Sequence, residues 1–252
     1  MYFDLISSVK STTEIFARPF SPTSSPLFSN YGVALRTGHI HIAFLNSLVI
    51  SAGTILITGA VASLASFVLA RMLFRLQNAI YVLFIMGLMI PVQAVIIPLT
   101  IGVTVAGLRG NFFIIMLIFT AQYLPLAVFI LVGLMKSIPT ELEEAAYADG
   151  GGHLTIFLNV ILPLSKAAMS TVTIFVFLYS WNDLLVPLVF TVGETQRTLS
   201  IGLLSFFGGM TGQSSYGAFM AAALFAILPP IVLYLAASER VQQGLTAGAL
   251  KG

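Results

Sequence analysis

Four stretches of the chain contain no Asp, Glu, Lys or Arg at all. They lie between Arg36 and Arg71, Arg75 and Arg109, Arg109 and Lys136, and Arg197 and Glu239. Each exceeds the ~20 residues that a helix needs to cross the hydrocarbon core of a bilayer. A backbone inside lipid must satisfy its own hydrogen bonds, and the alternating strands of about ten residues that build a membrane barrel are absent. The expected fold class is therefore all-α transmembrane.

The composition agrees with a chain that lies in lipid. Charged residues make up 8% of the sequence, against about 25% in soluble domains, and the mean hydropathy is +1.01. The absence of cysteine excludes disulfides, thiolate metal ligands and cysteine nucleophiles. A formal net charge of +2 is too small an excess to favour nucleic acid. We therefore expect the lipid bilayer as the surroundings and no nucleic-acid partner.

Five membrane-spanning helices are predicted from these apolar stretches and from the run after Lys166. Their expected ranges are 42–70, 78–103, 111–135, 167–190 and 216–237. Arg71, Arg75, Lys136, Lys166, Arg240 and Lys251 fall in connections on one side of the bilayer, whereas Arg109 and Arg197 fall on the other. The positive-inside rule then puts the connection between the third and fourth helices in the cytoplasm, together with the C-terminus.

Residues 1–41 would then lie outside the cell membrane, although they carry Lys10, Arg18 and Arg36. The opening letters, MYFDLISS, are typical of the end of an apolar helix, and the prolines that follow predict an extended loop. A further helix before Met1 would restore an even number of crossings and reconcile these charges. A true five-helix protein with a peripheral arm is the alternative.

Prolines interrupt four of the five expected spans. They are Pro91 and Pro98 in the second, Pro125 in the third, Pro187 in the fourth, and Pro229 and Pro230 in the fifth. A proline removes a helical hydrogen bond, so the freed carbonyls need neighbouring helices or a hydrated cavity. Kinks in so many spans favour a transporter or a channel over a simple membrane anchor.

One polar segment interrupts the apolar sequence, and we name residues 139–163 the acidic loop. Its first half holds Glu141, Glu143, Glu144 and Asp149, followed by the glycines at 150–152. Thr140 and Glu143 have the spacing of a capping box, so a short helix is expected to begin at Glu141 and to end at the glycines. A second helix is expected to carry one apolar face, formed by Leu154, Phe157, Leu158, Ile161 and Leu162. Spacing alone leaves two interpretations: helices that lie on lipid headgroups, or a rigid knob that docks on a partner in water.

The letters EEAAYADGG, followed by Phe157, Ile161, Leu162 and Pro163, resemble the EAA loop of bacterial ATP-binding-cassette (ABC) importer permeases, E-A-A-x-x-D-G-A-x(n)-I-x-L-P. Glu144, Ala145, Ala146, Asp149 and Gly150 stand at the matching positions. Gly151 replaces the usual alanine and is expected to loosen the elbow slightly. The segment WNDLLVPLVF at 181–190 and the ending GLTAGALKG at 244–252 are similar to maltose and multiple-sugar permeases. The resemblance covers essentially the whole chain after about Tyr31.

This resemblance implies the helical bundle of a type I ABC importer permease, with five spans in this chain and a first helix that precedes it in the family. It implies an extracytoplasmic segment at 1–41, a permease domain at 42–240 that contains the acidic loop, and a cytoplasmic tail at 241–252. The docking residues that it implies for an ATPase subunit are Glu144, Ala145, Ala146, Asp149, Gly150, Phe157, Ile161 and Pro163. Tail contacts to the ATPase are expected at Gly244, Leu245, Thr246, Gly248 and Lys251.

The implied function is that of a membrane subunit of a carbohydrate importer in the bacterial inner membrane. The implied partners are a second, homologous permease, two ATPase subunits and an extracytoplasmic solute-binding protein. The chain itself is expected to be no enzyme and to hold no cofactor, because ATP and magnesium would be bound by the ATPase. In agreement, the sequence has no G-x-x-x-x-G-K-[ST], H-E-x-x-H or G-x-S-x-G motif, and its histidines at 39, 41 and 153 are too scattered for a metal site.

Asp183 is the one carboxylate well within an expected span, and ionisable groups inside membranes are usually functional. Asp183 and Asn182 could bind sugar hydroxyls while the Trp181 indole stacks on a sugar ring. Other candidates for a substrate path are Gln93, Gln122, Tyr123 and Asn46. For all of these residues, hydrogen bonding between helices is the alternative role. The alternative function is an ion-coupled secondary carrier or channel subunit, although a relay of several ionisable groups would be more typical of a carrier.

Overall fold

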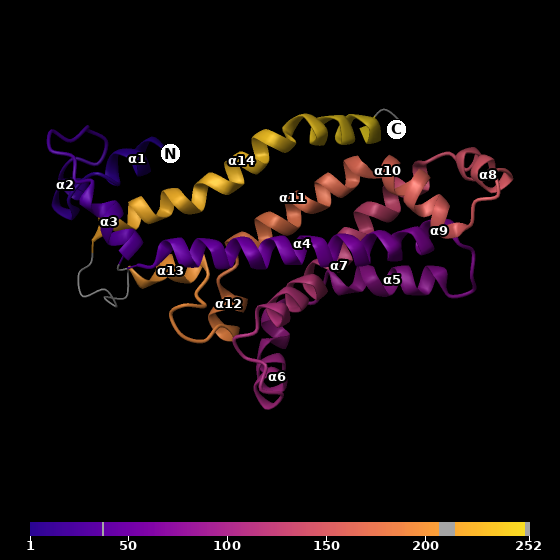
Figure 1. The fold of residues 1–252 in the computed structure, drawn as a ribbon, viewed down its shortest axis with the longest axis horizontal. Coiled ribbons are helices and arrows are strands. Elements are labelled where there is room, and N and C mark those ends of the chain that lie inside the picture. Colours follow the sequence, from indigo (N-terminus) through magenta and orange to yellow (C-terminus); the bar gives the residue numbers. More distant parts are fainter. Residues whose placement is uncertain (37, 207–214, 250–252) are drawn as a thin grey trace. The chain divides into compact units, whose positions relative to one another are not determined.

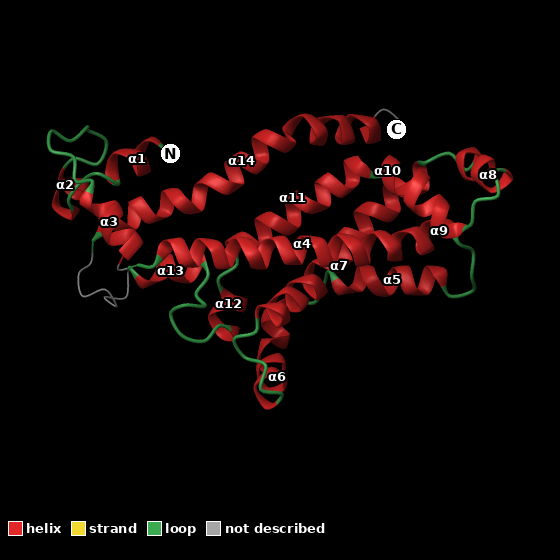
Figure 2. Cartoon of the chain, viewed as in Figure 1, coloured by secondary structure: helices red, strands yellow, loops and turns green. Residues whose placement is uncertain are grey.

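The computed structural model describes residues 1–36, 38–206 and 215–249, and this part of the chain folds into helices and loops without strands (Figures 1 and 2). This confirms the all-α prediction. The chain divides into two compact units. The first contains Met1–Ser51, Gly102–Ile115 and Tyr179–Tyr234, and the second contains Ala52–Ile101, Met116–Leu178 and Leu235–Gly252.

Three helices within the described residues are long and apolar enough to cross a membrane by themselves. They are α4 (Ile40–Arg71), α7 (Phe112–Ser137) and α14 (Tyr216–Ala249). The first two agree closely with the predicted spans. The third begins where predicted but continues to Ala249, so the segment expected to be a tail is mostly an extension of the last helix.

The second predicted span is broken into two helices. α5 (Gln77–Gly87) and α6 (Val92–Val105) meet at an angle of 92°, so the single helix expected over 78–103 is wrong. Pro91 explains the position of the break, because proline has no N–H and disfavours helical geometry at the residue before it. Pro98 and Pro125, in contrast, lie inside α6 and α7.

The fourth predicted span, 167–190, is also wrong at its end. α11 (Lys166–Asn182) stops before Asp183, and a separate helix, α12 (Leu185–Phe190), follows. The Asp183 carboxylate accepts a hydrogen bond of 2.9 Å from the backbone N–H of Val186. The side chain therefore satisfies one of the free N–H groups at the start of α12. Pro187 then lies in the first turn of α12, where its missing N–H costs nothing.

Two bent helix pairs also have the length and apolar composition of a membrane span. The α5 and α6 pair is one, and the segment His153–Leu164 with Lys166–Asn182, bent by 73°, is the other. Counting each pair as one span gives up to five spans in the described residues, which is the predicted number. The second pair begins within the acidic loop, however, so only its Lys166–Asn182 part corresponds to the predicted fourth span.

The N-terminal residues fold more than the sequence predicted. They form α1 (Tyr2–Ser7), α2 (Thr12–Ala17) and α3 (Ser29–Arg36), so the expected extended loop is confined to the proline-containing stretch between α2 and α3. Lys10 is fully buried, and its ammonium donates a hydrogen bond of 2.7 Å to the carbonyl of Arg18. Asn30 donates to the carbonyls of Ser8 and Lys10. These polar contacts join the three short helices, beside the buried side chains of Ile15 and Ala34.

In the second unit, α4 and α7 pack through small and polar residues. A Cβ atom on Gly53 would clash with the sulfur of Met116, so the two helices are close at this point. Farther along, Thr58 donates to Thr120 at 3.2 Å, and Ser66 donates to the carbonyl of Val128 at 3.5 Å. Each step along α4 is matched by a step in the same direction along α7, so the two helices are parallel. Small residues and interhelical hydrogen bonds are the usual means of helix association in membranes.

In the first unit, α13 (Leu199–Ser205) lies against the start of α4. Asn46 on α4 donates hydrogen bonds to the carbonyls of Thr195 and Arg197, at 2.8 and 2.9 Å, and the Ser47 hydroxyl accepts from the N–H of Leu199. Asn46 therefore ties the loop before α13 to α4, which differs from the hydrogen bonding between helices considered for it; its place in a substrate path stays a prediction.

Candidate functional site

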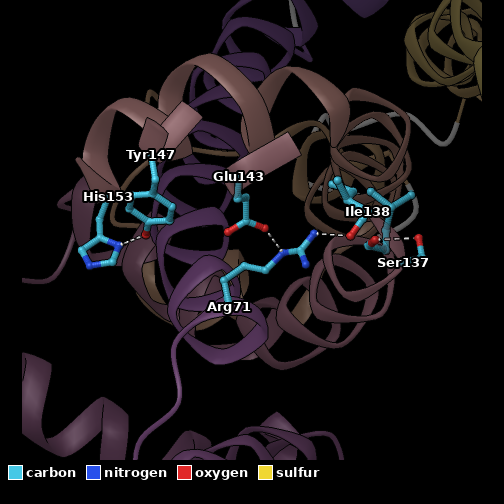
Figure 3. A network of polar contacts seen from close by, with 7 residues as sticks. Arg71, Ser137, Ile138, Glu143, Tyr147 and His153 are labelled. Atoms are coloured by element: carbon cyan, nitrogen blue, oxygen red, sulfur yellow. Dashed lines mark hydrogen bonds and ion pairs between the residues drawn. The ribbon is translucent and has the colours of Figure 1, made fainter. Parts of the chain in front are cut away.

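The first arm of the acidic loop is α8 (Glu141–Ala148), which begins at the predicted residue. The predicted capping box is wrong, however, because the Thr140 side chain makes no capping hydrogen bond. The Glu143 carboxylate turns instead to Arg71, with 2.9 Å between Oε1 and Nε (Figure 3). Both side chains are almost fully buried, and their charges attract as an ion pair although the N–H of Nε does not point at Oε1 as in a hydrogen bond.

The glycines after α8 form a tight and well-defined elbow. Gly150 has φ +84, in the left-handed region that glycine adopts without steric cost. Its N–H donates to the carbonyl of Tyr147, and the N–H of Gly151 donates to the carbonyl of Ala146, both at 2.9 Å. This pair of bonds is a Schellman motif, a common way to end a helix. Tyr147 and His153 also meet across the elbow through a hydrogen bond between the hydroxyl and Nδ1 (Figure 3).

Gly151 makes the elbow tighter, whereas the sequence suggested that it makes the elbow looser. A Cβ atom there would lie 2.7 Å from the backbone oxygen of Ala146, closer than real Cβ atoms approach a backbone atom. The expectation that glycine loosens the elbow is therefore wrong. Here the glycine allows the chain to turn more tightly than an alanine would permit.

The second arm is helical but not a regular α-helix. It consists of α9 (His153–Ile156), a π-helical turn η1 (Phe157–Ile161) and α10 (Leu162–Leu164). The predicted apolar face is wrong in detail, because Leu154 and Leu158 are 65% and 49% exposed while Ile156, Phe157 and Ile161 are buried. The i to i+5 bonding of a π turn has a wider period than the α-helix on which the prediction rested, so it shifts the buried face.

The residues expected to dock on an ATPase fall into two groups. Five of them, Glu144, Ala145, Asp149, Gly150 and Pro163, are exposed, and Ala146 is half-buried. Phe157 and Ile161 are buried, and the Phe157 ring packs on Phe67 of α4 with 5.2 Å between ring centroids. The exposed surface combines carboxylates with small side chains, so a partner carrying cationic groups can approach closely. The two buried residues hold the second arm in place beneath it.

The expected substrate-path residues of the second unit differ in environment. Gln93 on α6 is exposed, and Gln122 on α7 is half-buried with an Oε1 that has no hydrogen-bond partner among the described residues. Tyr123 is buried and stacks on Phe119, with 5.8 Å between ring centroids. Their role in a substrate path stays a prediction.

The expected path residues of the first unit lie at the junction of α11 and α12. Trp181 is 2% exposed, its indole N–H donates to the carbonyl of Ala226 at 3.0 Å, and its ring meets Phe44 edge-on. Asn182 is exposed, and Asp183, just before the N-cap residue Leu184 of α12, is half-buried and accepts a hydrogen bond from the N–H of Val186. Sugar binding by these three residues stays a prediction, and for Trp181 the indole packs within the unit in this conformation.

The expected tail contacts lie at the end of α14. Gly244, Leu245, Thr246 and Gly248 belong to that helix, and Lys251 lies outside the described residues. Two further residues near the acidic loop, Arg71 and Phe67, were missed as partners of this loop by the sequence analysis. Arg71 entered the sequence argument only as one of the basic residues that indicate the cytoplasmic side, and nothing in its local sequence indicates a partner on α8.

Comparisons with known proteins give the family. The family model described as binding-protein-dependent transport system inner membrane component matches residues 62–246. The melibiose/raffinose/stachyose import permease protein MelC of Bacillus subtilis is 34% identical over 252 residues, which cover 100% of this chain and 90% of that protein. The diacetylchitobiose uptake system permease protein NgcG of Streptomyces coelicolor is 30% identical over 251 residues, covering 100% of this chain and 83% of that protein.

A solved structure supports the same fold. A bacterial ABC transporter involved in the import of the acidic polysaccharide alginate contains a chain that matches with a TM-score of 0.81 at 21% identity, covering 94% of this chain and 88% of that one. The apolar spans and the matched family model agree in placing the protein in the membrane. The chain therefore belongs to the family of binding-protein-dependent transport system inner membrane components, as a multi-pass protein of the bacterial inner membrane.

Proposed function

We propose that the chain is a permease subunit of an ATP-driven carbohydrate importer and that the acidic loop seats in an ATPase subunit. The observation that carries the proposal is the exposed surface of the loop. Glu144 and Asp149 are accessible carboxylates, and Ala145 and Gly150 beside them present almost no side chain. A rigid knob of this kind can enter a cleft in a partner and accept hydrogen bonds from cationic groups there.

The buried ion pair of Glu143 with Arg71 supports docking on a protein over simple adsorption on lipid headgroups. A helix lying on the membrane surface needs an apolar face toward the lipid and a polar face toward water. In α8 the carboxylate of Glu143 is instead buried against Arg71, which fixes the orientation of the helix. A fixed orientation lowers the entropy that binding of a partner costs.

The proposed substrate is a carbohydrate, by analogy with relatives whose names specify melibiose, raffinose and stachyose in one case and diacetylchitobiose in another. The proposed assembly contains a second, homologous permease, two ATPase subunits and an extracytoplasmic solute-binding protein. ATP and magnesium would be held by the ATPase. The role of this chain would be to couple ATP hydrolysis to solute movement.

Co-purification in mild detergent tests this proposal. The tagged chain should elute with an ATPase subunit, and Glu144→Lys should abolish that association while the chain still inserts. Glu194→Lys is the control, because it makes the same charge change at an exposed site outside the acidic loop. An ion-coupled carrier would elute without an ATPase, and equal recovery of the ATPase with both variants would refute the docking assignment.

A further inference from the structure

The last turn of α4 contacts both arms of the acidic loop, although α4 is not adjacent to the loop in sequence. Arg71 ends α4 and forms the ion pair with Glu143 in the first turn of α8. Phe67, one turn earlier on the same face, packs on Phe157 in the second arm. The covalent connections of the loop run to α7 and α11, so α4 is a third helix attached to it.

The Arg71 guanidinium joins three helix ends at once. Besides the ion pair, its Nη2 donates a hydrogen bond of 2.7 Å to the carbonyl of Ile138, just past the end of α7 (Figure 3). A helix leaves carbonyls free at its C-terminal end, which favour a cation, and N–H groups free at its N-terminal end, which favour an anion. Arg71 lies at the C-terminal ends of α4 and α7, and Glu143 lies at the N-terminal end of α8. Each charge is therefore at the helix end that stabilises it.

Burial makes this contact stiff. The side chains of Arg71 and Glu143 are 6% and 11% exposed, so little water competes for either charge. Separating a buried pair leaves two uncompensated charges, and such a change is strongly unfavourable. A displacement of α8 is therefore transmitted to the end of α4 before the pair opens.

We propose that Arg71 is a positioning residue through which movement of the acidic loop reaches α4, with the contact of Phe67 and Phe157 as the second point of attachment. This inference rests on the proposed docking of the loop on an ATPase and adds the internal route of the motion. α4 in turn packs along α7 through Thr58, Thr120 and Ser66. Movement of the loop would thus displace α4 and α7 as one body.

The experiment uses the complete importer in proteoliposomes and measures solute uptake per ATP hydrolysed. The variant Arg71→Ala/Glu143→Ala removes the link and leaves no buried unpaired charge, and both positions are helical, where alanine is favourable. We expect it to assemble with the ATPase as the unmodified chain does, while uptake per ATP falls at least tenfold. Arg75→Ala, at an exposed arginine in the loop between α4 and α5, is the matched control and should leave the ratio unchanged.

Two further variants separate transmission from folding. Arg71→Lys keeps the charge but replaces the planar fork by a single point donor, so the coupling ratio should fall to an intermediate value. Because the chain has no cysteine, Arg71→Cys/Glu143→Cys can be joined by a short bifunctional maleimide, and joining should restore coupling.

An unchanged ratio in the alanine pair, or equal ratios in the joined and unjoined cysteine pair, would overturn the inference. Loss of ATPase association in the alanine pair would overturn it too, because the ion pair would then serve assembly. The docking proposal is tested separately from the role of Arg71: it is refuted if Glu144→Lys leaves ATPase association intact.

Discussion

Replacing Gly150 by alanine tests whether function depends on the left-handed backbone conformation at the elbow of the acidic loop. Gly150 has φ +84, and a Cβ atom there would meet nothing within 4 Å in this chain. The substitution therefore adds strain without a clash. Left-handed geometry costs a residue with a Cβ atom roughly 1–2 kcal/mol, which corresponds to a factor of about 5–30 in population.

That factor bounds the functional effect. If the partner binds only the elbow conformation, solute-stimulated ATP hydrolysis at limiting ATPase concentration should fall by about 5- to 30-fold in Gly150→Ala. Gly150→Asn should lose less, because asparagine tolerates the left-handed region better than alanine does. Gly152→Ala is the matched control, since Gly152 has φ −86 and also has open space around its Cβ position.

The assay is stimulated hydrolysis in nanodiscs, titrated with ATPase subunit so that the apparent affinity is obtained. The reasoning is refuted if Gly150→Ala behaves like Gly152→Ala. If Gly150→Asn has a lower apparent affinity for the ATPase subunit than Gly150→Ala has, then side-chain size at the partner surface matters more than backbone strain.

Three further predictions concern other parts of the chain. Gly151→Ala should destabilise the folded conformation of the acidic loop by about 1–3 kcal/mol, as expected for overpacking against a backbone atom, even though alanine is the usual residue in the resembled motif. Limited proteolysis should then cut the loop faster. An unchanged cutting rate would contradict the tight elbow. Asp183→Ala should lower the stability of the chain by about 0.5–1.5 kcal/mol through loss of the hydrogen bond from Val186, whereas Asp183→Asn, which keeps an acceptor oxygen at the same place, should largely retain it. Equal thermal unfolding of the two variants would argue against this role. Asn182→Cys should react with a water-soluble maleimide and Trp181→Cys should not, because Asn182 is exposed and Trp181 is 2% exposed; the reverse order of reactivity would contradict the described junction.

The long helices were predictable because the signal for them is composition over many residues. α4 and α7 start and end close to the predicted positions, since charged residues at 36, 71, 109 and 136 bound their apolar runs. The broken spans were predictable only in part. Pro91 indicated a kink, but the bend of 92° depends on how α5 and α6 pack. The start of α12 is accompanied by a hydrogen bond from the N–H of Val186 to the Asp183 carboxylate, and sequence alone could not separate this role from that of a substrate-binding carboxylate.

The details of the acidic loop were less predictable because they depend on distant residues. Glu143 had the spacing for a capping box, yet its carboxylate is taken by Arg71 of α4. No local pattern reports such a partner. The π-helical turn at Phe157–Ile161 likewise changed which apolar residues are buried, because the period used for the prediction was that of an α-helix. The start of α8 and the glycine end were correct, since both rest on local backbone preferences.

The break between α5 and α6 limits how this protein can lie in a bilayer. α5 has 11 residues, a length of ~16 Å, so the break falls near the middle of a ~30 Å hydrocarbon core. There the N–H groups of Leu88, Met89 and Ile90 bond three residues back instead of four, and irregular backbone at that depth is tolerated only when protein or water covers it. Within the described residues, none of α5 is buried. Part of the cover comes from this chain, because a Cβ atom on Gly87 would lie 2.8 Å from the ring of Pro125 on α7. The remaining side of the break must face protein or water and not lipid, which limits the orientations that α5 and α6 can take in the bilayer.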